Sequence, residues 1–305
     1  MVRKSNLPGV SSMIETLNKH HETVNYKWVD GVRLYHNIKT DSFPPHWHKE
    51  AEIIMPLSNS YGVRVGLSGE LNSIEEDEII IIPPGEMHTI YTPPTGARLI
   101  VDVDFTPYMN LRGVGSLINS LSPYRIIRKE GNPELSRTLK NYLLLIEEEY
   151  NKKDLFCDAS IHSLFTSFFV TLGRQDINNL QTDRYKPEQK LQYAEKFADI
   201  SYYINLHCTE PLRLEDIASY TGFSKFHFCR LFKEFVGCTF HDYVTGCRLA
   251  HAQSLLASAA TTITEAALQS GFTSLATFNR IFKEKKRCTP TEYRKLLRSS
   301  SAGEK

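Results

Sequence analysis

The stretch GFSKFHFCRLFKE, residues 222–234, recurs further along the chain as GFTSLATFNRIFKE, residues 271–284. The second copy has one extra residue between its Gly-Phe pair and its arginine. Beyond that point the two copies stay in register, since Cys238-Thr239 recurs as Cys288-Thr289. A repeat of this length predicts a structural unit that occurs twice in the fold.

Each copy contains the parts of a helix-turn-helix unit. Amphipathic segments come first (residues 214–220 and 263–270), and Gly222 or Gly271 then supplies a turn that favours a positive φ. A serine or threonine after the turn can cap the following helix. An ordinary helix pair joined by a glycine turn is the alternative for a single copy. The duplication, and a predicted rigid connecting helix over residues 240–258, favour two helix-turn-helix units.

Residues 191–297 resemble the AraC/XylS family of bacterial transcription regulators. The resemblance implies two DNA-reading units, each inserting its second helix into the major groove. One departure is Arg287, where the family commonly has the glycine that Gly237 supplies in the first copy. The matching motifs are Ile217-Ala218, Gly222-Phe223-Ser224, Arg230-x-Phe232-Lys233, Gly237, Tyr243, Arg248-Leu249, Ala252, Leu255-Leu256, Gly271-Phe272, Phe278, Arg280-x-Phe282-Lys283, Thr289-Pro290 and Tyr293-Arg294.

The second helix of each unit has one stripe predicted to face DNA and an opposite stripe predicted to be core. An arginine suits a bidentate contact with guanine and an asparagine a contact with adenine, while a phosphate clamp is the alternative for either arginine. The predicted DNA-binding residues are Lys225, Phe226, His227, Cys229, Arg230, Ser274, Ala276, Thr277, Asn279, Arg280, Lys283 and Lys286. The predicted core residues are Phe228, Leu231, Phe232, Phe278, Ile281 and Phe282.

Length and charge divide the chain in two. A chain of 305 residues favours two domains. Residues 189–305 contain 16 Lys and Arg against 11 Asp and Glu, a net charge of +5, whereas residues 1–188 have a net charge of −4. The basic half is the candidate for a polyanionic partner. We expect an N-terminal domain over residues 1–173, a polar linker over 174–188 and a DNA-binding domain over 189–298.

The sequence also argues against several protein classes. It begins without the apolar run of a signal peptide and contains no stretch of about 18 apolar residues. We therefore expect a cytoplasmic protein that does not contact a membrane. The six cysteines are irregularly spaced without a C-x-x-C pair, so they are expected to be free thiols rather than zinc-finger ligands.

The N-terminal half is predicted to consist of strands followed by helices. Its short β-rich runs are punctuated by prolines, which is typical of an all-β sandwich or barrel. Two helical patterns follow, over residues 133–150 and 159–172. On the first, Leu139, Leu143 and Ile146 share one stripe, which packs on its own domain or forms the seam of a dimer.

The segment PHWHKEAE, residues 45–52, places His46, His48 and Glu52 on one face of a continuous strand. The later PPGEMH ends in His88. This pattern resembles the metal-binding cupins, which use H-x-H-x3-E and P-x-G-x2-H. It departs from them at flanking positions, where the cupin glycines and an asparagine are replaced by Asn59, Asp77 and Thr92.

Two uses of this cluster stay open. Three imidazoles and one carboxylate suit a divalent transition metal, and the predicted metal ligands are His46, His48, Glu52 and His88. Regulators with such a front barrel generally bind a small organic effector, often a sugar, without metal. On that interpretation no cofactor is expected, and the same four residues bind the effector together with Trp47, which either stacks on a sugar or packs outside on the barrel wall. A purely structural histidine cluster is the third alternative.

These features predict a two-domain chain, with an N-terminal all-β cupin-like barrel carrying appended helices and a C-terminal all-α domain with two helix-turn-helix units. The leading hypothesis is a non-enzymatic, effector-controlled transcription regulator. Its expected partners are double-stranded DNA, a small-molecule effector, RNA polymerase and a second copy of the chain. The alternatives are a metal-dependent cupin enzyme fused to a DNA-binding module, and a ligand-independent DNA-binding protein with a purely dimerising barrel.

Overall fold

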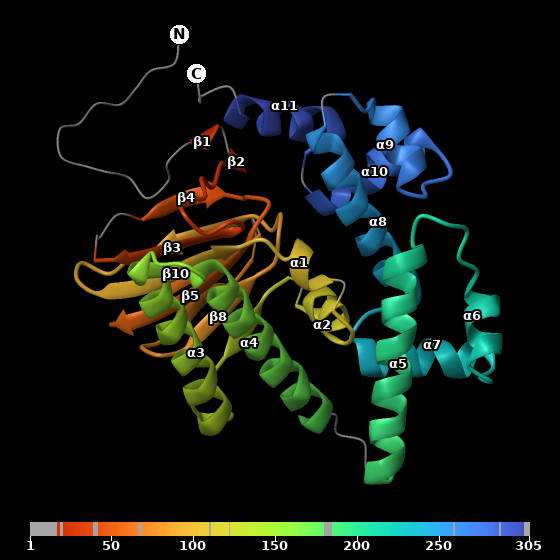
Figure 1. Ribbon diagram of the computed structural model, residues 1–305, viewed down its shortest axis with the longest axis horizontal. Coiled ribbons are helices and arrows are strands. Elements are labelled where there is room, and N and C mark those ends of the chain that lie inside the picture. The colour runs from red at the N-terminus through yellow and green to blue at the C-terminus, as the bar shows by residue number, and fades with distance from the viewer. Residues whose placement is uncertain are drawn as a thin grey trace.

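The computed structural model describes residues 17–18, 21–38, 42–66, 69–109, 111–121, 123–179, 185–258, 260–286 and 288–301. Figure 1 shows two parts: β-sheets with helices packed against one face, and a group of helices beside them. The predicted N-terminal β domain and C-terminal helical domain are thereby confirmed.

The N-terminal part contains two antiparallel sheets and a short two-stranded ribbon, β1-β2. The larger sheet has the strand order β11-β8-β5-β10-β3, and the smaller has the order β4-β9-β6-β7. The strands are β1 (Leu17–Asn18), β2 (His21–Glu22), β3 (Val32–Asn37), β4 (Phe43–His46), β5 (Ala51–Ser58), β6 (Tyr61–Val65), β7 (Leu71–Ile74), β8 (Ile79–Ile82), β9 (His88–Tyr91), β10 (Ala97–Val103) and β11 (Arg125–Ile127).

The two larger sheets are separate across the described residues, so the β domain is not a closed barrel in the predicted cupin sense. One open edge lies at β4, which pairs only with β9 in the sheet. Pro44 and Pro45 explain this edge, because proline has no N–H to donate to a second neighbouring strand.

Alternating side chains of the sheets fill two separate cores. In β8, Ile79 and Ile81 belong to the core under the helices, whereas Ile80 and Ile82 belong to the core between the sheets. This alternation is the period of two that a strand imposes. It explains why β8 is apolar on both faces.

The backbone keeps the turns that the cupin glycines provide. Asn59 has φ 63° and Asp77 has φ 65°, both in the left-handed region. Asn and Asp tolerate this region better than other non-glycine residues. The departures noted in the sequence therefore preserve the local geometry.

Four helices belong to the N-terminal part: α1 (Thr106–Met109), α2 (Val114–Ser120), α3 (Pro133–Lys152) and α4 (Cys157–Asn179). The predicted stripe of Leu139, Leu143 and Ile146 lies on α3, and all three side chains are fully buried in the core under the helices. The stripe therefore packs on its own domain, and its interpretation as a dimer seam is wrong, because these three side chains leave nothing exposed for a second copy to contact.

The C-terminal part is entirely helical, with α5 (Pro187–His207), α6 (Leu214–Tyr220), α7 (Lys225–Val236), α8 (Phe240–Ala257), α9 (Ile263–Gln269), α10 (Leu275–Lys286) and α11 (Pro290–Ser301). The predicted connecting helix is α8. The predicted linker over 174–188 is shorter in the structure, because α4 continues to Asn179 and α5 begins at Pro187. Residues 180–184 lie outside the described residues.

This part has two hydrophobic cores that share α8. The first core joins α5, α6, α7 and the first half of α8. The second joins the rest of α8 with α9, α10 and α11, and it also includes Trp47 and Met87 from the β domain. The repeat in the sequence thus corresponds to two packed units, one at each end of α8.

None of the described helices combines the length and the apolar character that crossing a bilayer requires. All six cysteines are free thiols, as predicted. Burial raises the pKa of Cys238 to about 11 and that of Cys288 to about 12, which keeps both thiols protonated at neutral pH.

Candidate functional site

The first helix-turn-helix unit consists of α6, a turn at Gly222, and α7. Gly222 has φ 74°, and the backbone N–H of Phe223 donates to the carbonyl of Ala218 at 3.1 Å. The Ser224 side chain caps α7 by accepting a hydrogen bond from the backbone N–H of His227. The predicted glycine turn and serine cap are confirmed.

The second unit, α9 and α10, repeats this geometry. Gly271 has φ 83°, and the N–H of Phe272 donates to the carbonyl of Ala267, again at 3.1 Å. A capping box between Thr262 and Glu265 begins α9. Arg287, which departs from the family pattern, lies outside the described residues.

The second helix of each unit has an apolar face and a polar face, divided as the sequence predicts. Five of the six predicted core residues are fully buried (Phe228, Leu231, Phe232, Phe278 and Phe282), and Ile281 is half-buried. The exposed residues among those predicted to contact DNA are Lys225, Phe226, Arg230, Ala276, Asn279, Arg280 and Lys283. His227, Cys229, Ser274, Thr277 and Lys286 are half-buried.

Phe226 is the most unusual residue on these faces, because its side chain is 87% exposed. A large apolar side chain that projects from a basic helix is available to contact an apolar group of a binding partner, such as a thymine methyl. His227, in contrast, packs its ring edge against Phe223 at a centroid distance of 5.0 Å.

The predicted base-reading arginines have equivalent acidic partners. Arg230 lies 3.7 Å from Glu234 on α7, and Arg280 lies 3.4 Å from Glu284 on α10. Each pair is separated by four residues. Both guanidinium groups are exposed, and an exposed pair such as Arg280–Glu284 contributes only about 0–1 kcal/mol, so Arg280 is readily released to another anion.

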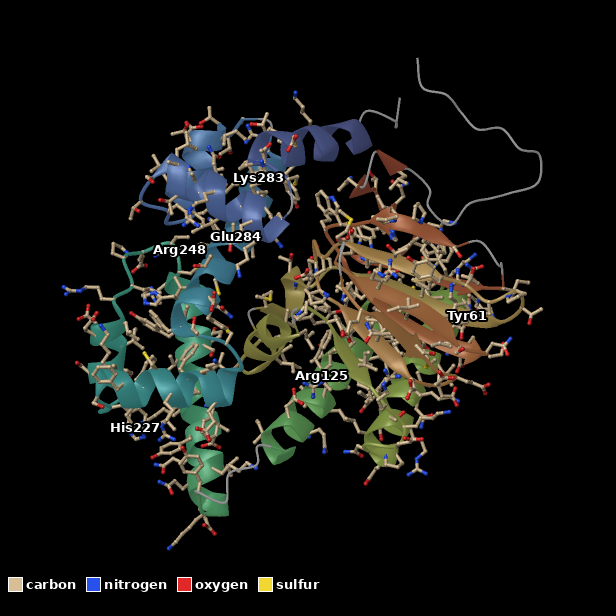
Figure 2. The ribbon with its side chains drawn as sticks, turned by 180° about the vertical axis from the view of Figure 1, so that it is seen from behind. Tyr61, Arg125, His227, Arg248, Lys283 and Glu284 are labelled. Atoms are coloured by element: carbon tan, nitrogen blue, oxygen red, sulfur yellow. The ribbon has the colours of Figure 1, made fainter. Side chains whose placement is uncertain are left out.

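Figure 2 shows His227 and Lys283 well apart, in different units, with Arg248 of α8 between them. Arg248 is structural, since its guanidinium donates to the carbonyls of Cys208 and Glu210. Lys286 was predicted to contact DNA, but in the structure its side chain faces the β domain. Its ammonium donates to the carbonyl of Pro84 in the β domain at 3.3 Å, because the end of α10 packs there. Burial lowers the pKa of Lys286.

The β domain brings His46, His48, Glu52 and His88 together. Their donor atoms all lie within 4.8 Å of one another, and all four side chains are buried. The predicted continuous strand through residues 46–52 is wrong. The chain leaves β4 of the smaller sheet at His46 and enters β5 of the larger sheet at Ala51, so the cluster is held between the sheets.

Each imidazole of the cluster is oriented by a backbone carbonyl. The Nδ1 atoms of His46, His48 and His88 lie 2.8, 3.1 and 2.9 Å from the carbonyl oxygens of Pro44, Glu50 and Glu86, respectively. Because a carbonyl only accepts, each Nδ1–H donates, which leaves each Nε2 facing the cluster. His88 Nε2 lies 2.7 Å and His48 Nε2 lies 3.9 Å from Glu52 Oε2.

The protonation of the cluster follows from burial and mutual charge. Burial lowers the pKa of His46 to about 3 and that of His48 to about 4, which keeps both imidazoles neutral. Burial alone would raise the pKa of Glu52, but the adjacent His88 and the other histidines bring it to about 2. Burial opposes the charge of His88, and the Glu52 carboxylate outweighs this and raises the pKa of His88. The imidazoles of His46 and His48 are therefore neutral, whereas His88 forms an ion pair with the Glu52 carboxylate.

Three further buried acidic residues lie beside the cluster: Glu22, Glu50 and Asp102. Glu22 Oε2 is 3.3 Å from His46 Nε2, and Asp102 Oδ1 is 3.9 Å from His48 Nε2. Burial, with the nearby carboxylates, raises the pKa of Asp102 well above its usual value. The sequence motifs missed these residues. Asp102 was recognisable only from its place on β10, where it has the same parity as Ile100, a residue of the core between the sheets.

Trp47, predicted to bind an effector with the cluster, faces away from it. Its ring stacks on Tyr293 of α11 at 6.0 Å and contacts the edge of His21 at 4.5 Å. Successive side chains of an extended chain point to opposite sides, so Trp47 points away from the cluster while His46 and His48 point toward it.

A known family model matches the helical part of the chain. Residues 217–296 match the family model described as a helix-turn-helix domain. The chain is 42% identical over 89 residues to the probable transcription factor PqrA of Proteus vulgaris, an alignment that covers 29% of this chain and 73% of PqrA.

The chain is also 37% identical over 110 residues to an uncharacterized HTH-type transcriptional regulator of Staphylococcus aureus strain COL. That alignment covers 36% of this chain and only 15% of the length of the relative. Among solved structures, ToxT from Vibrio cholerae aligns over 87% of this chain and 98% of its own, with 18% identity and a TM-score of 0.46. The DNA-binding domain of AdpA in complex with a target DNA aligns over 34% of this chain and 93% of its own, with 24% identity and a TM-score of 0.33.

Proposed function

Since this chain belongs to the AraC/XylS family of helix-turn-helix transcription regulators, we propose that it controls transcription by binding double-stranded DNA through α7 and α10. The observation that carries the proposal is the repeated unit, whose second helix exposes a basic face in both copies while its phenylalanines fill the core. A cytoplasmic location, a homodimer and contact with RNA polymerase belong to the same proposal.

We assign the exposed residues, and the half-buried Ser274 and Thr277, the following contacts. Arg230 and Arg280 suit guanine, Asn279 suits adenine, and Phe226 and Ala276 suit thymine methyl groups. Lys225, Ser274, Thr277 and Lys283 supply phosphate contacts at the ends of the two helices. The half-buried His227 and Cys229 border this surface.

The connecting helix favours a bipartite binding site. An α-helix of 18 residues is about 27 Å long, and α8 has a unit at each end. Successive major grooves on one face of DNA are about 34 Å apart. Two recognition helices joined in this way can read two half-sites on one face of the duplex.

We further propose that the β domain is the sensory part and that the His46, His48, Glu52 and His88 cluster is its effector site. A sugar effector gains no support from the geometry, because four donor atoms within 4.8 Å of one another leave no room for a sugar ring. The relatives aligned with this chain are described as transcription regulators, which favours sensing over catalysis by a metal-dependent cupin enzyme.

Selection of binding sites from random duplexes with the purified full chain tests the DNA-binding proposal. We expect enrichment of one bipartite sequence, with half-sites about 10 bp apart centre to centre. Variants Arg230→Ala and Arg280→Ala should each relax the preference at a position in a different half-site. If the protein bound all duplexes with equal affinity, and that affinity depended only on salt concentration, the proposal would be overturned.

A further inference from the structure

The size of the cluster fits a single metal ion. Zinc binds imidazole nitrogen at about 2.0–2.1 Å, so two ligands of a tetrahedral ion lie about 3.4 Å apart. The donor atoms of His46, His48, Glu52 and His88 lie within 4.8 Å of one another, and His88 Nε2 and Glu52 Oε2 are only 2.7 Å apart. Small side-chain movements bring all four atoms to bonding distance.

The orientation of the histidines is a second, independent observation. Metal-binding histidines almost always donate their other ring N–H to a carbonyl or carboxylate. All three imidazoles here donate Nδ1–H to backbone carbonyls. The three Nε2 atoms therefore face one another, so binding of an ion requires no rearrangement of the backbone.

The residues next to the ligands form part of the second helix-turn-helix unit. Trp47, between His46 and His48, and Met87, next to His88, are both buried in the core formed by α8 to α11. Two chain segments therefore each present a ligand to the cluster on one side and a core residue to the second unit on the other.

The turn before His88 provides a third contact with the same unit. Gly85 has φ 79°, and a Cβ built there would lie 3.1 Å from Cδ of Lys286. The ammonium group of Lys286 donates to the carbonyl of Pro84. The end of α10 thus packs against the segment that carries His88.

We propose that His46, His48, Glu52 and His88 bind one divalent transition-metal ion, and that the ion holds the second helix-turn-helix unit against the β domain. The ion joins the segment containing Trp47 to the segment containing Met87. Both segments then form one rigid docking surface for α10 and α11. Loss of the ion loosens this surface, while the first unit keeps its own core. The consequence for DNA reading rests on the proposed function; the binding of metal and the docking do not.

Metal content of the full chain tests the site. After treatment with a chelator, the chain is loaded with Zn²⁺ or Co²⁺, passed through a desalting column and assayed by mass spectrometry. We expect one ion per wild-type chain. His88→Ala and Glu52→Gln should lower metal affinity by at least the roughly 10–100-fold that loss of an outer-shell partner costs.

His36→Ala is the matched control, because His36 also contacts a glutamate, Glu147, but on the surface of the β domain. This variant should keep the ion. The absorption spectrum of bound Co²⁺ distinguishes imidazole and carboxylate ligands from the six thiols, since thiolates add an intense near-ultraviolet band. Wild-type retention no higher than that of His88→Ala, or a thiolate band, would overturn the site. Circular dichroism checks that each variant is folded.

Trp47 reports the docking without any DNA. The chain has two tryptophans, so Trp28→Phe leaves Trp47 as the only one. We expect acrylamide to quench Trp47 more strongly after metal removal, to approach the quenching seen in a Tyr293→Ala variant, and to return to the low value when Zn²⁺ is restored. Quenching that is equal with and without bound metal would overturn the coupling. Because neither assay uses DNA, failure of DNA binding would count against the proposed function alone.

Discussion

The two helix-turn-helix units share a motif, a turn and an exposed basic face, yet they are stabilised differently. The first unit fills its core with residues of α5 to α8, and polar contacts such as Asn205 to the carbonyl of Met109 join it to the β domain. The second unit needs Trp47 and Met87 to complete its core. A duplicated sequence therefore gives two units with similar exposed faces but unequal dependence on the β domain.

The largest effect is expected from the buried aromatic residues that distinguish the two cores. Trp47→Ala should destabilise α9–α11 by about 3–5 kcal/mol and leave α6 and α7 protected, because only the second core contains this ring. Phe197→Ala on α5 is the mirror-image control and should expose the first unit selectively. Hydrogen exchange measures both variants. Equal loss of protection in the two units with either variant would refute the difference.

The next effect tests the similarity of the reading faces. Arg280→Ala and Arg230→Ala should each weaken DNA binding by about 1–3 kcal/mol and relax one base-pair preference. Titration against a panel of single-base operator variants measures this. Uniform weakening across the panel would identify the arginine as a phosphate contact instead.

A smaller effect separates two lysines on α10. Lys283 is exposed, whereas Lys286 donates to Pro84. Lys283→Ala should reduce the dependence of log K on log salt by about 0.9, the value for one phosphate contact. Lys286→Ala should leave that slope unchanged in the docked protein. A matching loss of slope in Lys286→Ala would place Lys286 on DNA.

The smallest effect concerns the acidic partners of the arginines. Glu284→Gln should change stability by no more than about 0.5 kcal/mol, because exposed pairs four residues apart contribute little, whereas Glu234→Gln should cost somewhat more, since Glu234 is half-buried and also accepts a hydrogen bond from Tyr185. Both variants should bind DNA slightly more tightly, since the arginine no longer leaves a carboxylate. Denaturant titration and operator binding measure the two effects. A large loss of stability in Glu284→Gln would show that the Arg280–Glu284 pair supports the fold.

Local patterns in the sequence predicted the helix-turn-helix units because all their determinants are close in the chain. Gly222, Ser224 and the buried phenylalanines act within one turn and two helices. Asn59 and Asp77, by contrast, were interpreted only as departures from the cupin pattern, although both adopt the left-handed conformation that a glycine would provide.

The sequence failed where distant segments meet. Lys286 and Pro84 are 202 residues apart, and nothing near either residue indicates their contact. Trp47 was grouped with the cluster, with packing outside the barrel wall as its alternative, and in the structure its ring stacks on Tyr293 of α11. The four cluster residues lie together as expected, although they are not on the continuous strand from which this was inferred. His46 on β4 and Glu52 on β5 still point to the same place, because the two sheets to which these strands belong face each other.

The spacing of the two half-sites tests the central claim most directly. In a fluorescence anisotropy titration with the full chain, insertion of about 5 bp between the selected half-sites turns them to opposite faces of DNA. Because α8 joins the units rigidly, we predict that affinity falls to that of a duplex with a single half-site. Unchanged affinity after the insertion would contradict the account, since it would mean that α7 and α10 do not read the duplex together.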